Sequence, residues 1–319
     1  MHFQAFPLKM PGLSEKLAAH APENPFHVVG YLSAVQSFGA EVWIGGLFEE
    51  DSPVGLSGLF LWRGRLNSTL VIASLPVCAS LPEYWSGLVE FGQRQGMTQI
   101  DANSFASPSF TVPAIDRIRG GRDRFEYVLD LTSYKLDGIH AKHRYSIRRA
   151  EAAGLKISRS CTEDACREHV RVVSLSQDRH RMKGESIDVG TNFNECASLC
   201  REGCAEVFQA TAGGVVLSSA TIMRSKSGAY YHTAGNAPEG LACGASHFLI
   251  HNAACLLQDD GVSVFNLGGA QPDTSLATYK ERFGAKQVPL KTVKLYIGQA
   301  WRERITIWLK WIKSTRARR

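Results

Sequence analysis

Long apolar runs are missing from this sequence. No stretch reaches the roughly 20 consecutive apolar residues that a membrane-spanning helix requires. The opening stretch is interrupted by Pro7, Lys9 and Pro11, unlike the apolar segment of a secretory signal peptide. We therefore expect a cytoplasmic protein. Its 319 residues, 44% hydrophobic and 21% charged, have the composition of a globular chain that forms one large domain or two medium ones.

Familiar cofactor and metal motifs are also missing. The sequence contains no Walker loop, no Rossmann fingerprint and no Gly-x-Ser-x-Gly nucleophile elbow. The eight cysteines include Cys196, Cys200 and Cys204, whose spacing fits no common zinc or cluster site and places them on one side of a helix. His247 and His251 lie four residues apart without a third ligand at a fixed spacing. We expect reduced thiols in the core and no bound metal.

An excess of positive charge is confined to the end of the chain. The net charge is +6, and residues 301–319 carry seven basic side chains and one acidic side chain, which leaves 29 of each sign in the first 300 residues. A helix at 301–319 would have an apolar stripe, formed by Trp301, Ile305, Trp308, Leu309 and Ile312. We expect a basic amphipathic helix there, which either docks on the core or makes a peripheral contact with an anionic membrane.

Hydrophobic periodicity predicts an α+β protein. In the N-terminal part we expect strands at 41–48, 56–62, 68–72, 98–102 and 125–130, and a helix at 84–96. After residue 138 we expect helices at 139–154, from 162, and at 193–201, 244–258 and 275–283, with strands at 155–158, 206–210, 215–224, 229–234, 262–267 and 288–296. The three strands between 206 and 234 are joined by short turns and predict an antiparallel meander.

Three stretches of the C-terminal part carry recognisable motifs. The first is the basic helix HAKHRYSIRRAEAAG at 140–154. The second pairs AYYHTAGN at 229–236 with GASHFLIH at 244–251. The third pairs VFNLGG at 264–269 with LATYKERFG at 276–284.

Together these stretches resemble the FemA/FemB/FemX-like branch of the GNAT superfamily of acyltransferases. The resemblance implies a GNAT fold, in which helices flank a mixed, largely antiparallel sheet, with two GNAT-like halves. We therefore expect a degenerate GNAT-like domain at 1–135, a catalytic domain at 136–300 and the C-terminal helix at 301–319. A wedge should open between the strands that end at His232 and Leu267.

The resemblance also indicates where an acyl donor would bind. Gly244, Ala245 and Ser246 begin a long helix, whose free N–H groups suit a phosphate or an oxyanion. Gly268 and Gly269 end a strand and would admit the acyl arm of the donor. Lys280 matches a lysine of the branch that lies near donor phosphate.

Three residues are predicted to be catalytic. Tyr279 matches the tyrosine that protonates the leaving thiolate in GNAT enzymes. Asn266 stands where the branch usually carries Asp, and His232 lies near the expected site.

Substrate binding is predicted for Tyr231 and for three cations of the basic helix, Lys142, Arg144 and Arg148.

The predicted activity is transfer of an acyl or aminoacyl group to an amine by direct attack. The donor is acyl-CoA as a co-substrate or, alternatively, aminoacyl-tRNA, and the acceptor is a small-molecule amine, a saccharide or a cell-wall precursor. The near-neutral first 300 residues favour acyl-CoA, because tRNA binding generally requires a broad basic surface. A catalytically silent GNAT-like scaffold that binds a partner or a membrane through its tail is the alternative of another class.

Overall fold

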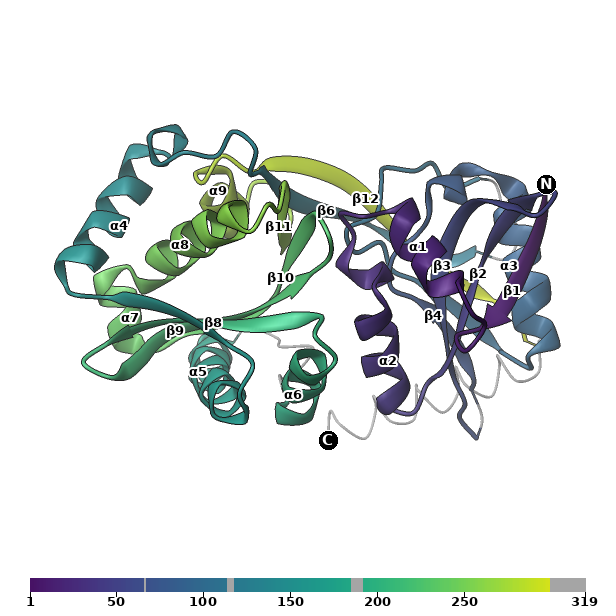
Figure 1. The fold of residues 1–319 in the computed structure, drawn as a ribbon, viewed down its shortest axis with the longest axis horizontal. Coiled ribbons are helices and arrows are strands. Elements are labelled where there is room, and N and C mark those ends of the chain that lie inside the picture. Colours follow the sequence, from purple (N-terminus) through teal and green to yellow (C-terminus); the bar gives the residue numbers. More distant parts are fainter. Residues whose placement is uncertain (66, 114–117, 185–191, 299–319) are drawn as a thin grey trace. The chain divides into compact units, whose positions relative to one another are not determined.

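The computed structural model describes residues 1–65, 67–113, 118–184 and 192–298 (Figure 1). These residues form two compact units, each assembled from separate segments of the chain. The first unit contains 1–20, 35–124 and the chain from Pro289, and the second contains 21–34 and 125–288. The predicted C-terminal helix at 301–319 lies outside the described residues.

The first unit is a six-stranded sheet covered by helices. Its strands are in the order β1-β2-β3-β4-β5-β12, antiparallel except for the parallel pair β4 and β5. Its elements are β1 (His2–Pro7), α1 (Leu13–His20), β2 (Glu41–Glu49), β3 (Ser52–Trp62), β4 (Thr69–Ile72), η2 (Val77–Ser80), α3 (Pro82–Arg94), β5 (Gln99–Ala102) and the later residues of β12 (Lys286–Tyr296). Tyr84 and Trp85 of α3 are fully buried against this sheet and anchor its core.

The second unit has its own six-stranded series, β6-β11-β10-β9-β8-β7. Every neighbouring pair is antiparallel except β10 with β11, which is parallel. Its strands are the later residues of β6 (Ile118–Asp130), β7 (Lys156–Ser160), β8 (Ala205–Ala212), β9 (Val215–Arg224), β10 (Gly228–Asn236) and β11 (Val264–Gly269). Its helices are η1 (Pro25–His27), η3 (Leu136–Gly138), α4 (Ala141–Ala152), α5 (Glu163–Met182), α6 (Phe193–Arg201), α7 (Pro238–Cys243), α8 (Ala245–Asp259) and α9 (Ser275–Glu281). The helix α2 (Val29–Ser37) contains the boundary between the units at residue 34.

Helices cover both faces of the second unit's sheet (Figure 1). The helix α8 packs across β8, β9 and β10, and its buried residues join the main core with Phe208 of β8 and Phe265 of β11. On the opposite face α5 lies against β9 and β10 so closely that a Cβ placed on Gly235 would be 2.5 Å from the Cα of Val173. Each strand therefore contributes alternate side chains to two different helical layers.

The predicted fold class is confirmed. The segments 229–234 and 262–267 form neighbouring strands of one sheet, as the wedge requires. The predicted domain boundary at residue 135 stays a prediction. The compact units divide within β6 and β12 instead: residues 21–34 belong to the second unit, and residues 289–298 belong to the first. Within the described residues, no helix has the length and apolar character needed to cross a membrane.

Replacing Gly235 tests the close approach of α5 to β10. We expect Gly235→Ala to destabilise the protein by roughly 1–3 kcal/mol, because the added methyl group meets backbone rather than a movable side chain. The measurement is the urea midpoint at an unchanged m-value. The matched control is Gly138→Ala, since a Cβ at Gly138 has no atom within 4 Å. Equal midpoints for the two variants would contradict this packing.

Candidate functional site

The central strands of the second unit part from each other. β10 and β11 pair at three positions only, the last of which joins Tyr230 to Asn266. Beyond it β10 shifts register against β9 between Tyr231 and Thr233, and β11 shifts register against β6 between Asn266 and Gly269. Such bulges bend a strand and leave backbone groups outside the ladder. We call this place, where the two strands separate after Tyr230 and Asn266, the fork.

A buried carboxylate ties the two strands together at the fork. Glu126 of β6 is 1% exposed. One of its oxygens accepts a hydrogen bond from the Tyr230 hydroxyl at 2.8 Å, and the other accepts one from Nδ2 of Asn266 at 2.6 Å. The Oδ1 of Asn266 in turn accepts from the backbone N–H of Gly268 at 2.8 Å. Asn266 therefore has two contacts at the end of β11: it accepts a hydrogen bond from Gly268 and donates one to the carboxylate of Glu126.

Sequence reasoning missed Glu126. It placed this residue within a strand but did not recognise an acid that points inward. The available signal was a single carboxylate between Phe125 and Tyr127 in a strand that otherwise reads as buried. A buried charge is retained only where partners compensate for its lost hydration.

Lys280 reaches the fork from α9. Its side chain is buried, and its Nζ donates a hydrogen bond to the backbone oxygen of Gly269 at 2.8 Å. Gly268 has a φ of 77°, and a Cβ built there would lie 3.7 Å from the Tyr230 hydroxyl and 3.9 Å from Nζ of Lys280. Lys280, Gly268 and Gly269, predicted separately as donor-binding residues, are therefore brought together with Tyr230.

A histidine–carboxylate pair lies on the α5 and α6 side of β10. His232 occupies the bulge of β10, where it has no register partner in β9. Its Nε2 donates to Oε1 of Glu195 on α6 at 3.3 Å, and both side chains keep part of their surface exposed. This hydrogen bond lowers the pKa of Glu195, although burial opposes the shift. Glu195 is a second residue that sequence reasoning missed, because it is 37 positions from its partner.

Tyr279 lies on the other side of the sheet, among aromatic rings. Its ring centroid is 5.0 Å from that of His247, 5.1 Å from that of His143 and 5.3 Å from that of Phe283. Its hydroxyl is buried and has no hydrogen-bond partner within the described chain. Burial raises the pKa of Tyr279, and the hydroxyl of Ser246 opposes this shift without meeting the geometry of a hydrogen bond. Tyr279 and Ser246, both predicted site residues, therefore face each other.

The turn before α8 is closely packed. Gly244 ends α7 and begins α8 with a φ of 84°, a conformation that favours glycine. A Cβ at this position would lie 2.8 Å from the carbonyl oxygen of Ser146 on α4. Ala245 is fully buried, so α4 already covers part of the predicted phosphate site, and Ser246 is the half-buried residue of this turn.

The predicted substrate-binding residues do not form one site. Arg144 donates two hydrogen bonds to backbone oxygens, those of Asp137 and Ile139, and so stabilises the start of its own helix. Lys142 and Arg148 are exposed on α4. Tyr231 packs against Phe265 on the same side of the sheet as α8.

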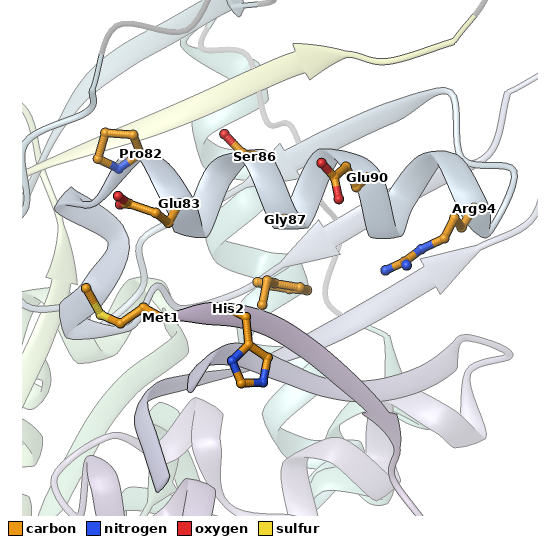
Figure 2. A pocket seen from close by; sticks show the side chains of 9 residues that line it. Met1, His2, Pro82, Glu83, Ser86, Gly87, Glu90 and Arg94 are labelled. Atoms are coloured by element: carbon orange, nitrogen blue, oxygen red, sulfur yellow. The ribbon is translucent and has the colours of Figure 1, made fainter. Parts of the chain in front are cut away.

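A shallow pocket in the first unit contains none of the predicted residues. It has a volume of about 490 Å³ and is lined by one side of α3 and by the beginning of β1, including Glu83, Glu90 and Arg94 (Figure 2). Its chemistry is that of an open polar surface. The fork remains the place where predicted residues gather.

Residues 139–281 match the family model described as an acetyltransferase (GNAT) domain. This chain carries a GNAT domain. The resemblance to the GNAT superfamily is thereby confirmed. No curated protein matches the chain.

Several solved structures share the fold of nearly the whole chain. FemX superposes with a TM-score of 0.68 at 10% identity, over 92% of this chain and 97% of its own. The C-terminal domain of a protein described as a lysylphosphatidylglycerol synthetase, from Agrobacterium fabrum, gives 0.57 at 15% identity, over 92% and 94%. A tandem GNAT protein from the clavulanic acid biosynthesis pathway gives 0.52 at 12% identity, over 94% and 99%. The fold is therefore that of the FemX-like and tandem GNAT proteins.

Two histidines, the fully buried His169 and the half-buried His247, make stability sensitive to acid. Burial lowers the pKa of His169 and that of His247 to about 4 each. The unfolded chain binds these protons near pH 6.5 and the folded chain does not, so stability should fall as the pH drops from about 6.5 to about 4. Urea unfolding at several pH values should show this loss, and a smaller slope in His169→Gln and in His247→Gln.

The exposed His20 supplies the control for that series. His20→Gln should keep the slope of the parent protein. A parent protein equally stable across this pH range would contradict the neutral state of these two rings in the folded chain.

Proposed function

We propose that the second unit transfers an acyl group from a thioester donor, acyl-CoA, to a primary amine at the fork. The observation that carries the proposal is that β10 and β11 stop pairing after Tyr230 and Asn266. Lys280 binds the backbone oxygen of Gly269 at this place, and the pair His232–Glu195 lies at the bulge of β10 that follows Tyr231. An extended acyl arm fits such a place, because diverging strands present N–H and C=O groups that no neighbouring strand uses.

The reaction needs no covalent enzyme intermediate. The amine nitrogen forms a bond to the acyl carbon, and the carbonyl electrons move to oxygen. When the carbonyl re-forms, the carbon–sulfur bond breaks and the thiolate leaves. One proton is removed from the nitrogen and one is gained by the sulfur, so the products are an amide and a thiol. The enzyme supplies orientation and electrostatic stabilisation.

His232 is the proposed base. A neutral imidazole accepts the proton that the attacking nitrogen loses, and the carboxylate of Glu195 stabilises the protonated ring. The partial exposure of both side chains gives an acceptor amine access to them. Glu195 is thus a positioning residue that acts through His232.

Lys280 and Tyr279 act on the donor. The Lys280 ammonium group is held at the fork by Gly269 and stabilises negative charge on the acyl oxygen. The raised pKa of Tyr279 keeps its hydroxyl protonated at neutral pH. Within the described chain this hydroxyl makes no hydrogen bond that would have to break before it binds a substrate atom. It can therefore donate a hydrogen bond to the departing sulfur.

Aminoacyl-tRNA is the second candidate donor. Three exposed cations of α4, Lys142, Arg148 and Arg149, face solvent and suit phosphate contacts. The likeness of fold to FemX and to a lysylphosphatidylglycerol synthetase supports this candidate and a cell-wall or lipid amine as acceptor. We favour acyl-CoA because the first 300 residues have as many acidic as basic side chains.

The dyad is tested by two substitutions. His232→Gln should lower kcat/KM by about 10²–10⁴-fold, the usual contribution of a general base. Glu195→Gln should lower kcat/KM less, because a neutral amide stabilises the ring less well when that ring accepts the proton in the transition state. The control is His20→Gln, which should match the parent protein. Full activity in His232→Gln would remove the proposed base.

The donor is tested with the purified chain and two ligands. We expect CoA to raise the melting temperature and labelled acyl-CoA to acylate an amine from a panel of small amines, saccharides and cell-wall precursors. Lys280→Met should lower kcat with acyl-CoA more than it lowers the stabilisation by free CoA, which has no acyl oxygen. If charged tRNA binds instead, with an affinity that falls steeply with salt, and CoA gives no stabilisation, the second donor replaces the first.

A further inference from the structure

Three cysteine thiols meet between α5 and α6. Cys166 comes from α5, and Cys196 and Cys200 come from successive turns of α6. They are 0%, 3% and 6% exposed, respectively. Their sulfur atoms all lie within 4.8 Å of one another, and the Sγ atoms of Cys166 and Cys200 are 3.8 Å apart.

This cluster differs from the cysteine stripe expected from the sequence. Cys204, the third member of that stripe, lies after α6 has ended, and its thiol donates to the backbone oxygen of Leu199 at 3.3 Å. Its place is taken by Cys166, which is 30 residues before Cys196 in the sequence and was not recognised as a partner. Only the packing of α5 against α6 brings the three thiols together.

We propose that Cys166, Cys196 and Cys200 bind one thiophilic divalent ion of the zinc class through three thiolates. A tetrahedral zinc ion with Zn–S bonds of about 2.3 Å holds its sulfur ligands about 3.8 Å apart. The separation of Cys166 and Cys200 already has this value. Small rotations of the Cys196 side chain complete the set, because the remaining distances do not exceed 4.8 Å.

The surroundings suit a metal thiolate. Ala165, Ala197 and Val207 complete this small cluster and exclude water without competing as ligands. The hydroxyl of Thr221 lies 3.6 Å from the Sγ of Cys196 and can donate a hydrogen bond to a thiolate. Binding releases three protons from three thiols, so the site with a divalent ion carries one negative charge.

An ion here would fix α6 to α5. Cys196 follows Glu195 directly, so the helix that carries the partner of His232 also carries two of the metal ligands. The metal site stands whether or not the fork transfers acyl groups, since it rests on the thiols alone.

The experiment uses the reduced full-length chain and Co²⁺ as a spectroscopic probe. We expect uptake of one equivalent with thiolate-to-cobalt charge-transfer absorption, displacement of the cobalt by Zn²⁺, and a rise in melting temperature with Zn²⁺. Absence of the charge-transfer band in the folded parent protein overturns the proposal. Loss of two thiols on air exposure without metal uptake also overturns it, because the cluster would then be a disulfide pair.

Variants locate the ion. Cys166→Ser and Cys200→Ser should lose the absorption band and the Zn²⁺-dependent stabilisation. Cys204→Ala and Cys78→Ala, which remove buried thiols outside the cluster, should keep both. Far-ultraviolet circular dichroism without metal shows whether each variant is folded. If a variant is not folded, the charge-transfer band of the parent protein decides the question. Uptake that survives in Cys200→Ser but is lost in Cys204→Ala or Cys78→Ala assigns the ion elsewhere and overturns the proposal.

Discussion

The second unit depends on one buried carboxylate. β10 and β11 must run side by side to close the core and then separate to form the fork, and backbone hydrogen bonds hold only the first part. Glu126 joins the strands at their last paired position, through Tyr230 on one and Asn266 on the other. An apolar side chain in place of Glu126 would leave the Tyr230 hydroxyl and the Asn266 amide buried without an acceptor. The strand ends would then no longer be held in the separated arrangement of the fork.

Most of the second unit's architecture was predictable because its elements are long and strongly patterned. Hydrophobic periodicity and the positions of glycines predict three features of this unit. They are the meander β8–β9–β10, the helix α8 and the strand that ends in Gly268 and Gly269. β1, α1 and α2 were not predicted, because short elements carry weak periodic signals. The inclusion of residues 21–34 in the second unit has no local signature, since it depends on contacts with residues far away in sequence.

The candidate site was predicted in part for the same reason. Lys280, Gly268 and Gly269 were chosen by their place in the chain and do come together. Arg144 was chosen for its charge, which the structure uses on neighbouring carbonyl groups instead. Glu126 and Glu195 act through partners more than 30 residues away. Such pairs can be recognised only after the sheet order and the helical layers are known.

The interleaved segments of the two units bear on how the chain folds during synthesis. The edge of β5 pairs with β12, and β12 begins at Lys286. The first unit therefore lacks one strand of its sheet until the ribosome has produced most of the second unit. Throughout that interval β5 presents an open edge to other nascent chains, a situation that favours slow folding and recruitment of chaperones. For the same reason, neither unit can be obtained as a contiguous fragment by cutting the gene once.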